Sequence, residues 1–198
     1  IIPIIVTIVI VLLALFVTAI YFPKLEKYVQ IICMIPYTIQ GVILSVSILS
    51  LYVGSSSILS NRLVMLMGAY CIVILPYIYQ GIRNGMRAVN MPTLIEAAEM
   101  LGASKIYAFF RVVVPNILSA IIVSSLLAVG IIFGDYVLIR NLAGTSAPNM
   151  QIFLYQTMKS DSTKASAVFV VIMFVTFVIT AIVLFVKSRE AKGKTHRK

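Results

Sequence analysis

The feature of this sequence that most limits its fold is a set of five long apolar runs separated by polar segments. About 20 apolar residues, at about 1.5 Å of rise per helical residue, span the hydrocarbon core of a bilayer. Because lipid offers the backbone no hydrogen-bond partners, each run is predicted to be a helix. The runs cover residues 1–22, 31–53, 63–82, 110–133 and 165–186. The predicted fold class is therefore all-α, a polytopic helical membrane protein with a single transmembrane domain over residues 1–198.

The distribution of charge predicts how these helices are oriented. Hydrophobic residues make up 61% of the chain and charged residues 11%, with a formal net charge of +10. If the first run crosses from outside to inside, segments 23–30, 83–109 and 187–198 are cytoplasmic, and about three quarters of the Lys and Arg residues lie in or beside them. The C-terminal tail is then a basic cytoplasmic segment. No basic stripe with stacking aromatic residues accompanies the charge, so nucleic acid is not expected as a partner.

The first run begins at Ile1 with neither a Met nor a basic flank before it. A signal peptide needs such a flank and a small-residue cleavage site, so we interpret this run as a membrane helix and expect further sequence upstream. The single histidine, His196, has no second ligand beside it in the sequence. The sequence predicts no metal site, no catalytic residues and no cofactor bound by this chain.

The inner loop at 83–109 contains the start of the stretch EAAEMLGASKIYAFFRVVVP (96–115), which differs from the rest of the chain because it combines acids, a glycine and a proline. Upstream of it, Pro92 and Thr93 are predicted to open a helix, with Glu96 in capping-box spacing after Thr93. Gly102 is placed to end that helix in the left-handed conformation. Ser104 is predicted to cap a second helix that continues into the fourth span. The prediction is a helix, a turn and a helix at the membrane surface.

The first helix of this loop is predicted to be amphipathic. Its apolar face comprises Leu94, Ile95, Ala98 and Leu101. Glu96 and Glu99 are then on the polar side, and because two acids three residues apart repel slightly, an external cation would stabilise them. The alternative is an interfacial helix whose acids are simply solvated.

The spacing of this loop resembles the EAA loop of membrane subunits in binding-protein-dependent ABC importers, the type I permeases. Glu96, Ala97 and Ala98 match the triplet, and Gly102 and Pro115 match the glycine and proline that follow it. Val112 and Val114 occupy positions where the family often has Ile and Leu. The match covers about twenty residues directly, on the predicted cytoplasmic side and two spans before the C-terminus.

The resemblance implies a transport subunit and no enzyme activity. Members of this family usually have a five-helix core, often preceded by another helix, which fits an upstream helix missing here. The loop would couple to a cytoplasmic ABC ATPase that binds ATP and Mg²⁺. The other implied partners are a second permease subunit, identical or paralogous, and an extracytoplasmic solute-binding protein, all at a bacterial inner membrane. The implied coupling residues are Glu96, Ala97, Ala98, Glu99, Gly102 and Pro115.

Polar residues within the spans are candidates for the translocation pathway. Proline interrupts the second and third spans, where it kinks a helix, and polar side chains beside each proline need partners in the interior. The fourth span carries small residues, which permit close approach of a neighbouring helix. Ser124 is one of them, and its presence is explained either by helix packing or by lining of a pore. Hydrogen bonding between helices explains the others equally well. The candidates are Tyr37, Gln40, Tyr79, Gln80 and Ser124.

The outer end of the fourth span, FGDYVLIRNLAG, contains the acid Asp135. An acid at a membrane edge marks a helix end or pairs with a neighbour such as Arg140, and the functional interpretation is contact with a cationic substrate or a binding protein. The segment after it is amphipathic around residues 150–158, which predicts a helix packed at the outer surface.

The same region carries the weakest inference, which is the substrate. GDY and NLAG make the chain similar to the spermidine/putrescine subgroup, and less closely to iron(III), thiamine or aminoalkylphosphonate permeases. Two alternatives come from other classes: a secondary transporter that works without an ATPase, and a membrane scaffold with no transport activity. A secondary transporter would be expected to show buried ion-coupling carboxylates, whereas every acid here lies near an interface or in a loop.

Overall fold

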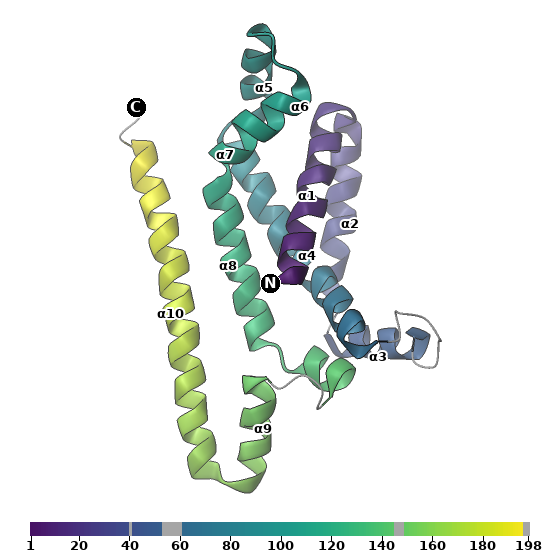
Figure 1. The fold of residues 1–198 in the computed structure, drawn as a ribbon, viewed down its shortest axis with the longest axis vertical. Coiled ribbons are helices and arrows are strands. Elements are labelled where there is room, and N and C mark those ends of the chain that lie inside the picture. Colours follow the sequence, from purple (N-terminus) through teal and green to yellow (C-terminus); the bar gives the residue numbers. More distant parts are fainter. Residues whose placement is uncertain (40, 53–60, 145–148, 196–198) are drawn as a thin grey trace.

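The computed structural model of the chain describes residues 1–39, 41–52, 61–144 and 149–195, and Gln40 and His196 lie outside them. Within these residues all regular secondary structure is helical, which confirms the all-α prediction (Figure 1). Three of the predicted spans are unbroken helices of membrane length and apolarity. They are α1 (Ile2–Ile20), α4 (Arg62–Ala88) and the segment Ser162–Ile182 of α10 (Ser162–Thr195).

The second predicted span is not one straight helix. It divides into α2 (Glu26–Thr38) and α3 (Gly41–Tyr52), whose axes enclose 96°. Pro36 lies inside α2 and has no N–H to donate to the turn before it, which weakens the helix there. The backbone at Ile39 is already extended, so α2 ends at Thr38, two residues after the proline. The short 3₁₀ helix η1 (Pro23–Leu25) connects α1 to α2.

The fourth predicted span is bent as well. It begins as α6 (Lys105–Ala108), the π-helical turn η3 (Phe109–Val113) and α7 (Val114–Asn116), and only then continues as α8 (Leu118–Gly134) at an angle of 65°. Pro115 cannot donate to the carbonyl four residues earlier and its ring crowds that carbonyl, which favours a widened turn. Pro115 lies in the first arm of this bent span, before the 65° bend.

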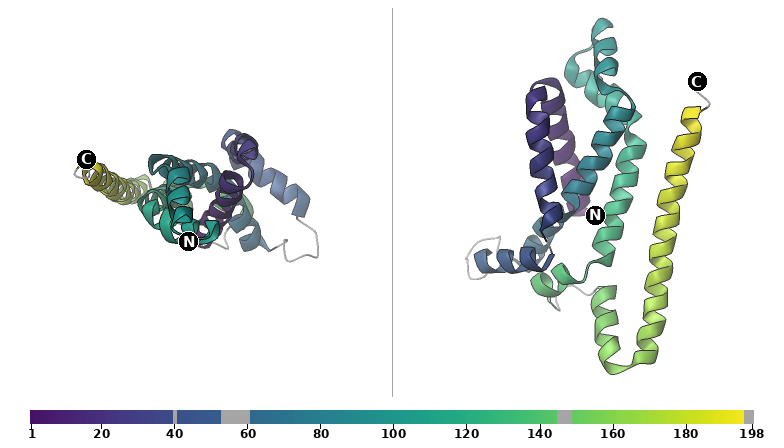
Figure 2. Two further views of the ribbon diagram at one scale, coloured as in Figure 1. Left: turned by 90° about the horizontal axis from the view of Figure 1, so that it is seen from above. Right: turned by 180° about the vertical axis from the view of Figure 1, so that it is seen from behind.

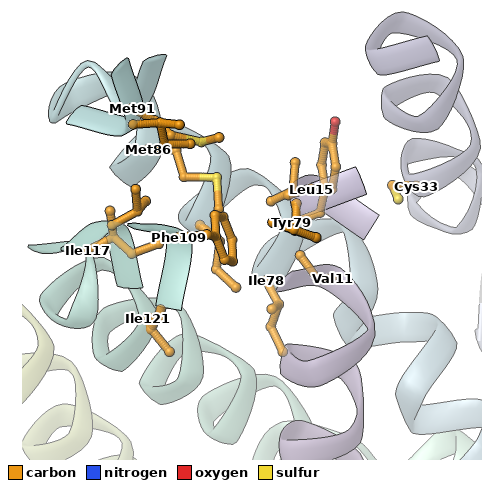
Figure 3. Packing of buried hydrophobic residues seen from close by; sticks show 14 of the residues in the cluster. Val11, Leu15, Cys33, Ile78, Tyr79, Met86, Met91, Phe109, Ile117 and Ile121 are labelled. Carbon is orange, nitrogen blue, oxygen red and sulfur yellow. The ribbon is translucent and has the colours of Figure 1, made fainter. Parts of the chain in front are cut away.

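Helix α4 is the centre of the fold. Helices α1, α2 and α8 all pack against it, and α10 packs against α8 on the far side. The largest buried cluster joins Val11 and Leu15 of α1 to Ile78 of α4, and extends to Phe109 and Ile117 below the inner loop (Figure 3). Two crossing helices and a capping loop therefore share one core.

The crossing of α4 and α8 depends on small residues. A Cβ placed on Gly81 would lie 2.5 Å from the Cβ of Ser124, and one on Gly85 would lie 2.6 Å from the Cβ of Ala120. The prediction that small residues of the fourth span allow close helix approach is confirmed for these positions. At Gly130, further along α8, an added Cβ would meet no described atom within 4 Å.

The helix ends fall into two groups at opposite ends of the molecule. The α1–α2 connection, α5 (Met91–Met100) and the C-terminal end of α10 lie together at one end (Figure 1). Helix α3, the π-helical turn η4 (Ile139–Ala143) and α9 (Met150–Ser160) lie at the other. The described parts of the three segments predicted to be cytoplasmic (23–30, 83–109 and 187–195) thus lie at one end of the molecule, and the amphipathic segment after Asp135 forms helix α9, packed against α10.

Candidate functional site

The inner loop begins with a tight reversal between α4 and α5. Asn90, at φ 51°, turns the chain, and the N–H of Leu94 donates to the Asn90 carbonyl at 3.3 Å. Helix α5 starts at Met91, one residue before the predicted opening at Pro92 and Thr93, and Thr93 falls within its first turn. The predicted capping box was wrong, because no side chain caps α5 and Thr93 is not at the position before the helix.

The end of α5 matches the prediction. Gly102 has φ +83°, and its N–H donates to the Glu99 carbonyl at 2.9 Å. The Ser104 hydroxyl accepts from the N–H of Tyr107 at 3.3 Å and so caps α6. Only glycine adopts the left-handed conformation without steric cost, so Gly102 reverses the chain toward the membrane within a few residues.

Helix α5 buries one face and exposes the other. Ile95 and Ala98 are buried on the side that packs on α6 and η3. Leu101, predicted on that face, is 88% exposed, because it follows the last helical residue and the turn at Gly102 directs it outward. Met100 beside it is 90% exposed. The apolar face is thus shorter than predicted, and two large apolar side chains project from the tip of the loop.

The two acids of α5 have different surroundings. A Glu99 carboxylate oxygen lies 3.8 Å from the Lys105 ammonium, so the cation that stabilises it comes from the same loop. Glu96 is exposed and forms no ion pair within the described residues. Ala97, next to it, is also exposed, whereas Ala98 is buried in the chain's own core. The outward surface of the loop therefore consists of Glu96 and Ala97 together with the apolar tip.

An ion cluster that the sequence did not predict holds the base of this loop. The Arg83 guanidinium donates twice to one Glu26 oxygen, from Nε at 2.9 Å and from Nη2 at 2.7 Å, and Arg87 lies 3.4 Å from the same oxygen. Glu26 begins α2, while both arginines lie in the last turns of α4, before the reversal at Asn90. The available signal in the sequence was that Glu26 and both arginines lie in segments predicted to be on the same, cytoplasmic side. However, 57 residues separate Arg83 from Glu26.

Two of the candidate residues for the translocation pathway lie in a cleft between α2 and α4. Tyr37 and Gln80 are both exposed, and the Tyr37 ring lies 5.5 Å from that of Tyr77 between centroids. The Gln80 amide nitrogen is 3.8 Å from the Met34 sulfur. The cleft has a volume of about 420 Å³ and is lined by Met34, Tyr37, Thr38, Pro76, Tyr77 and Gln80.

Two other candidates lie in the core of the chain and do not line this cleft. Tyr79 is fully buried beside Leu15 (Figure 3), and its hydroxyl has no hydrogen-bond partner within the described residues. Ser124 is buried at the α4–α8 crossing, and its hydroxyl donates to the carbonyls of Ala120 and Ile121 in its own helix. Helix packing accounts for the position of Ser124 in this chain.

Asp135 ends α8, as one interpretation predicted, but it does not pair with Arg140. Its carboxylate accepts from the Tyr70 hydroxyl at 3.0 Å and from the N–H of Ile139 at 3.4 Å. The Arg140 guanidinium instead donates to the Tyr136 hydroxyl at 3.4 Å. The N–H groups that begin the next helical turn already attract the acid, so Asp135 is held by hydrogen bonds rather than by a cation.

One family model covers almost the whole chain. It is the binding-protein-dependent transport system inner membrane component, which matches residues 1–190. The chain belongs to this family. It is therefore a permease subunit of an ABC importer, a transport component rather than an enzyme. A search among curated proteins finds no match to this permease.

Membership of the family explains why this permease combines long apolar helices with one polar loop. The matched range includes α5, the cleft between α2 and α4 and the outer end of α8. The family-level resemblance inferred from residues 96–115 is confirmed. The resemblance to the spermidine/putrescine subgroup stays a prediction.

Proposed function

We propose that this permease forms half of a translocation pathway and couples to a cytoplasmic ATPase through Glu96 to Gly102. The observation that carries the proposal is the one-sided burial of α5. Ile95 and Ala98 hold the helix to its own subunit, while Glu96 and the apolar tip are exposed. A small surface that combines a free carboxylate with exposed large apolar side chains is typical of a protein contact.

In this proposal the end of the molecule that carries α5 and the end of α10 faces the cytoplasm. ATP and Mg²⁺ bind to the partner ATPase, and this chain needs no cofactor. Closure of two ATPase subunits moves α5, and α5 moves the membrane helices because it packs on η3 and follows directly after α4, whose end the Glu26–Arg83 pair ties to α2. Two permease subunits then change between inward-open and outward-open arrangements, and a solute-binding protein delivers the substrate from outside.

The coupling proposal is tested by reconstituting the importer with Glu96→Lys or Gly102→Pro in this permease. Glu96→Lys reverses the free charge at the contact, and Gly102→Pro forbids the positive φ at the turn. Both variants should reduce substrate uptake per ATP hydrolysed. Lys164→Glu, a charge reversal at the opposite end of the molecule, serves as the control. Unchanged ATP-driven uptake in both loop variants would refute the coupling role, and uptake without an ATPase would favour a secondary transporter.

The substrate we propose is a polyamine such as spermidine or putrescine. Support comes from the resemblance of the segment around Asp135 and from a half-buried carboxylate at the outer end of α8. An iron(III), thiamine or aminoalkylphosphonate importer is the alternative.

The substrate proposal is tested by measuring spermidine uptake by wild type, Asp135→Asn and Tyr70→Phe over a range of external salt. Tyr70→Phe removes the hydrogen bond to Asp135 and keeps the negative charge. If the charge attracts the substrate, only Asp135→Asn slows uptake, and the difference shrinks as salt screens the interaction. Equal affinities and rates in wild type and Asp135→Asn would exclude a role of this acid in cation handling.

A further inference from the structure

We infer that the cleft between α2 and α4 faces the aqueous pathway and holds an organic ammonium group against the rings of Tyr37 and Tyr77. This inference deepens the proposed function and rests on it for the nature of the substrate. Its structural part, that water and not lipid fills the cleft, stands on the geometry alone.

The first argument is the cost of placing this surface against lipid. Tyr37 lies 11 residues beyond Glu26 (37 − 26) along α2, which corresponds to a depth of about 16 Å at 1.5 Å per residue. Its side chain is 65% exposed, and Gln80 opposite it is also exposed. An amide facing hydrocarbon without partners costs several kcal/mol. The weak contact of Gln80 with the Met34 sulfur, at 3.8 Å, does not replace the hydrogen bonds that water would supply.

The second argument is the contrast with α10, on the opposite side of the molecule (Figure 2). The exposed face of α10 is apolar, with large side chains at Val170, Phe174 and Phe177. Its hydroxyls at Thr176 and Thr180 each donate at 2.9 Å to a carbonyl of their own helix. That face satisfies the requirements of a lipid-facing helix, whereas the face of α2 and α4 does not.

The third argument is that the cleft continues toward the end of the molecule where α5 lies. A neighbouring hollow of about 440 Å³ shares Met34 and Thr38 with the cleft and extends past Gln30 to Lys27. These positions follow helical spacing on one side of α2. A stripe of mixed polarity, in which Ile31 and Ile35 lie beside Gln30 and Lys27, thus connects the aromatic pair with the loop end of α2.

The lining of the cleft determines which ligand it accepts. Its six residues carry no charge, and they present two phenol rings, an amide oxygen, a hydroxyl and a thioether. Aromatic faces and carbonyl-type oxygens attract an ammonium group. Without a carboxylate the attraction is weak, which suits a transit position, and the charge of Lys27 disfavours a cation resting further along the stripe.

The first test labels cysteines with charged thiol reagents in the reconstituted importer, after replacing Cys33 and Cys71 with alanine. Thr38→Cys and Gln80→Cys place a thiol in the cleft and leave both rings intact, and Phe174→Cys on α10 is the control. We expect the cleft thiols to react with a trimethylammonium methanethiosulfonate and the α10 thiol not to react. Cleft thiols as unreactive as the α10 thiol would overturn the inference.

The second test measures charge preference at Thr38→Cys. After correction for intrinsic reactivity, the trimethylammonium reagent should react at least ten-fold faster than the sulfonate reagent. Tyr37→Leu should remove most of this preference, while Tyr37→Phe, which keeps the aromatic face, should retain it. A preference that is unchanged in Tyr37→Leu, or equal rates for both reagents, would refute the ammonium site.

The third test uses spermidine to protect Thr38→Cys from the trimethylammonium reagent. Tyr37→Leu should raise the half-protecting concentration by between about two-fold and thirty-fold. If wild type takes up spermidine but spermidine gives no protection, the inference fails and the proposed function stands. If wild type takes up no spermidine while the charge preference persists, the polyamine proposal fails and the ammonium-selective cleft stands.

Discussion

The crossing of α4 and α8 makes a strong prediction about Gly81→Ala. The added Cβ would lie 2.5 Å from the Cβ of Ser124, whereas nonbonded carbon atoms prefer a separation of about 3.5–4.0 Å. The helices would have to move apart by about 1 Å, and neither atom belongs to a flexible side-chain end. Overpacking of this kind costs about 1–3 kcal/mol. We therefore expect Gly81→Ala to lower the free energy of unfolding by that amount.

The effect is measured by unfolding the purified permease in mixed micelles with increasing denaturing detergent. Gly68→Ala is the matched control, because Gly68 lies in the same helix and an added Cβ there meets no described atom within 4 Å. Glycine costs a helix interior up to about 1 kcal/mol relative to alanine, so the control should be neutral or slightly stabilised. Gly81→Ala should lower the free energy of unfolding, whereas Gly68→Ala should leave it unchanged or raise it slightly.

A second substitution provides the internal check on this reasoning. In the double variant Gly81→Ala with Ser124→Gly the clash is absent, and the helix-propensity changes of the two substitutions nearly cancel. Its free energy of unfolding should therefore return close to that of wild type. The reasoning is refuted if Gly81→Ala is as stable as Gly68→Ala, or if Ser124→Gly fails to restore stability.

Three further predictions concern the end of the molecule that carries α5. Gly102→Ala, at φ +83°, should strain the turn by about 1–2 kcal/mol and speed trypsin cleavage in the loop. Ser104→Ala removes a helix cap worth about 0.5–2 kcal/mol, which should raise hydrogen exchange in α6 and leave α9 unchanged. Glu26→Gln removes the charged partner of Arg83, whose side chain is 13% exposed, and should destabilise the permease by roughly 1–3 kcal/mol. Lys164→Gln, which removes the cation of an exposed ion pair, should change the unfolding midpoint less.

The helices and the loop turn follow from local rules and were predictable. Apolar length identified the helices, and glycine at 102 and serine at 104 act through their own backbone conformation and hydrogen bonds. The two bends were not predicted, although Pro36 was recognised as a kink. A proline shows where a helix is weakened, but the angle depends on what packs beside it.

The candidate functional residues also divide into features that the sequence predicted and features that it did not. The spacing of Glu96 and Gly102 in the sequence suggested the family, and the family model that matches residues 1–190 confirms it. The sequence did not distinguish Tyr37 from Tyr79, because both are tyrosines near a proline in an apolar run. The structure places Tyr37 in an open cleft and Tyr79 in the core. Which face of a helix points to a neighbour is settled by contacts between distant segments.

The sequence by itself determined that this chain is a helical membrane protein with a distinctive helix–turn–helix loop between its third and fourth spans. Hydrophobic length and helix-ending residues act over a few turns of chain, so their effects can be read along it. The tertiary structure alone decided that Glu26 meets Arg83, that Gly81 accommodates Ser124 and that Tyr37 meets Tyr77. Each of these contacts joins residues about 40 or more positions apart, and such pairs are selected by the packing of whole helices rather than by local propensity.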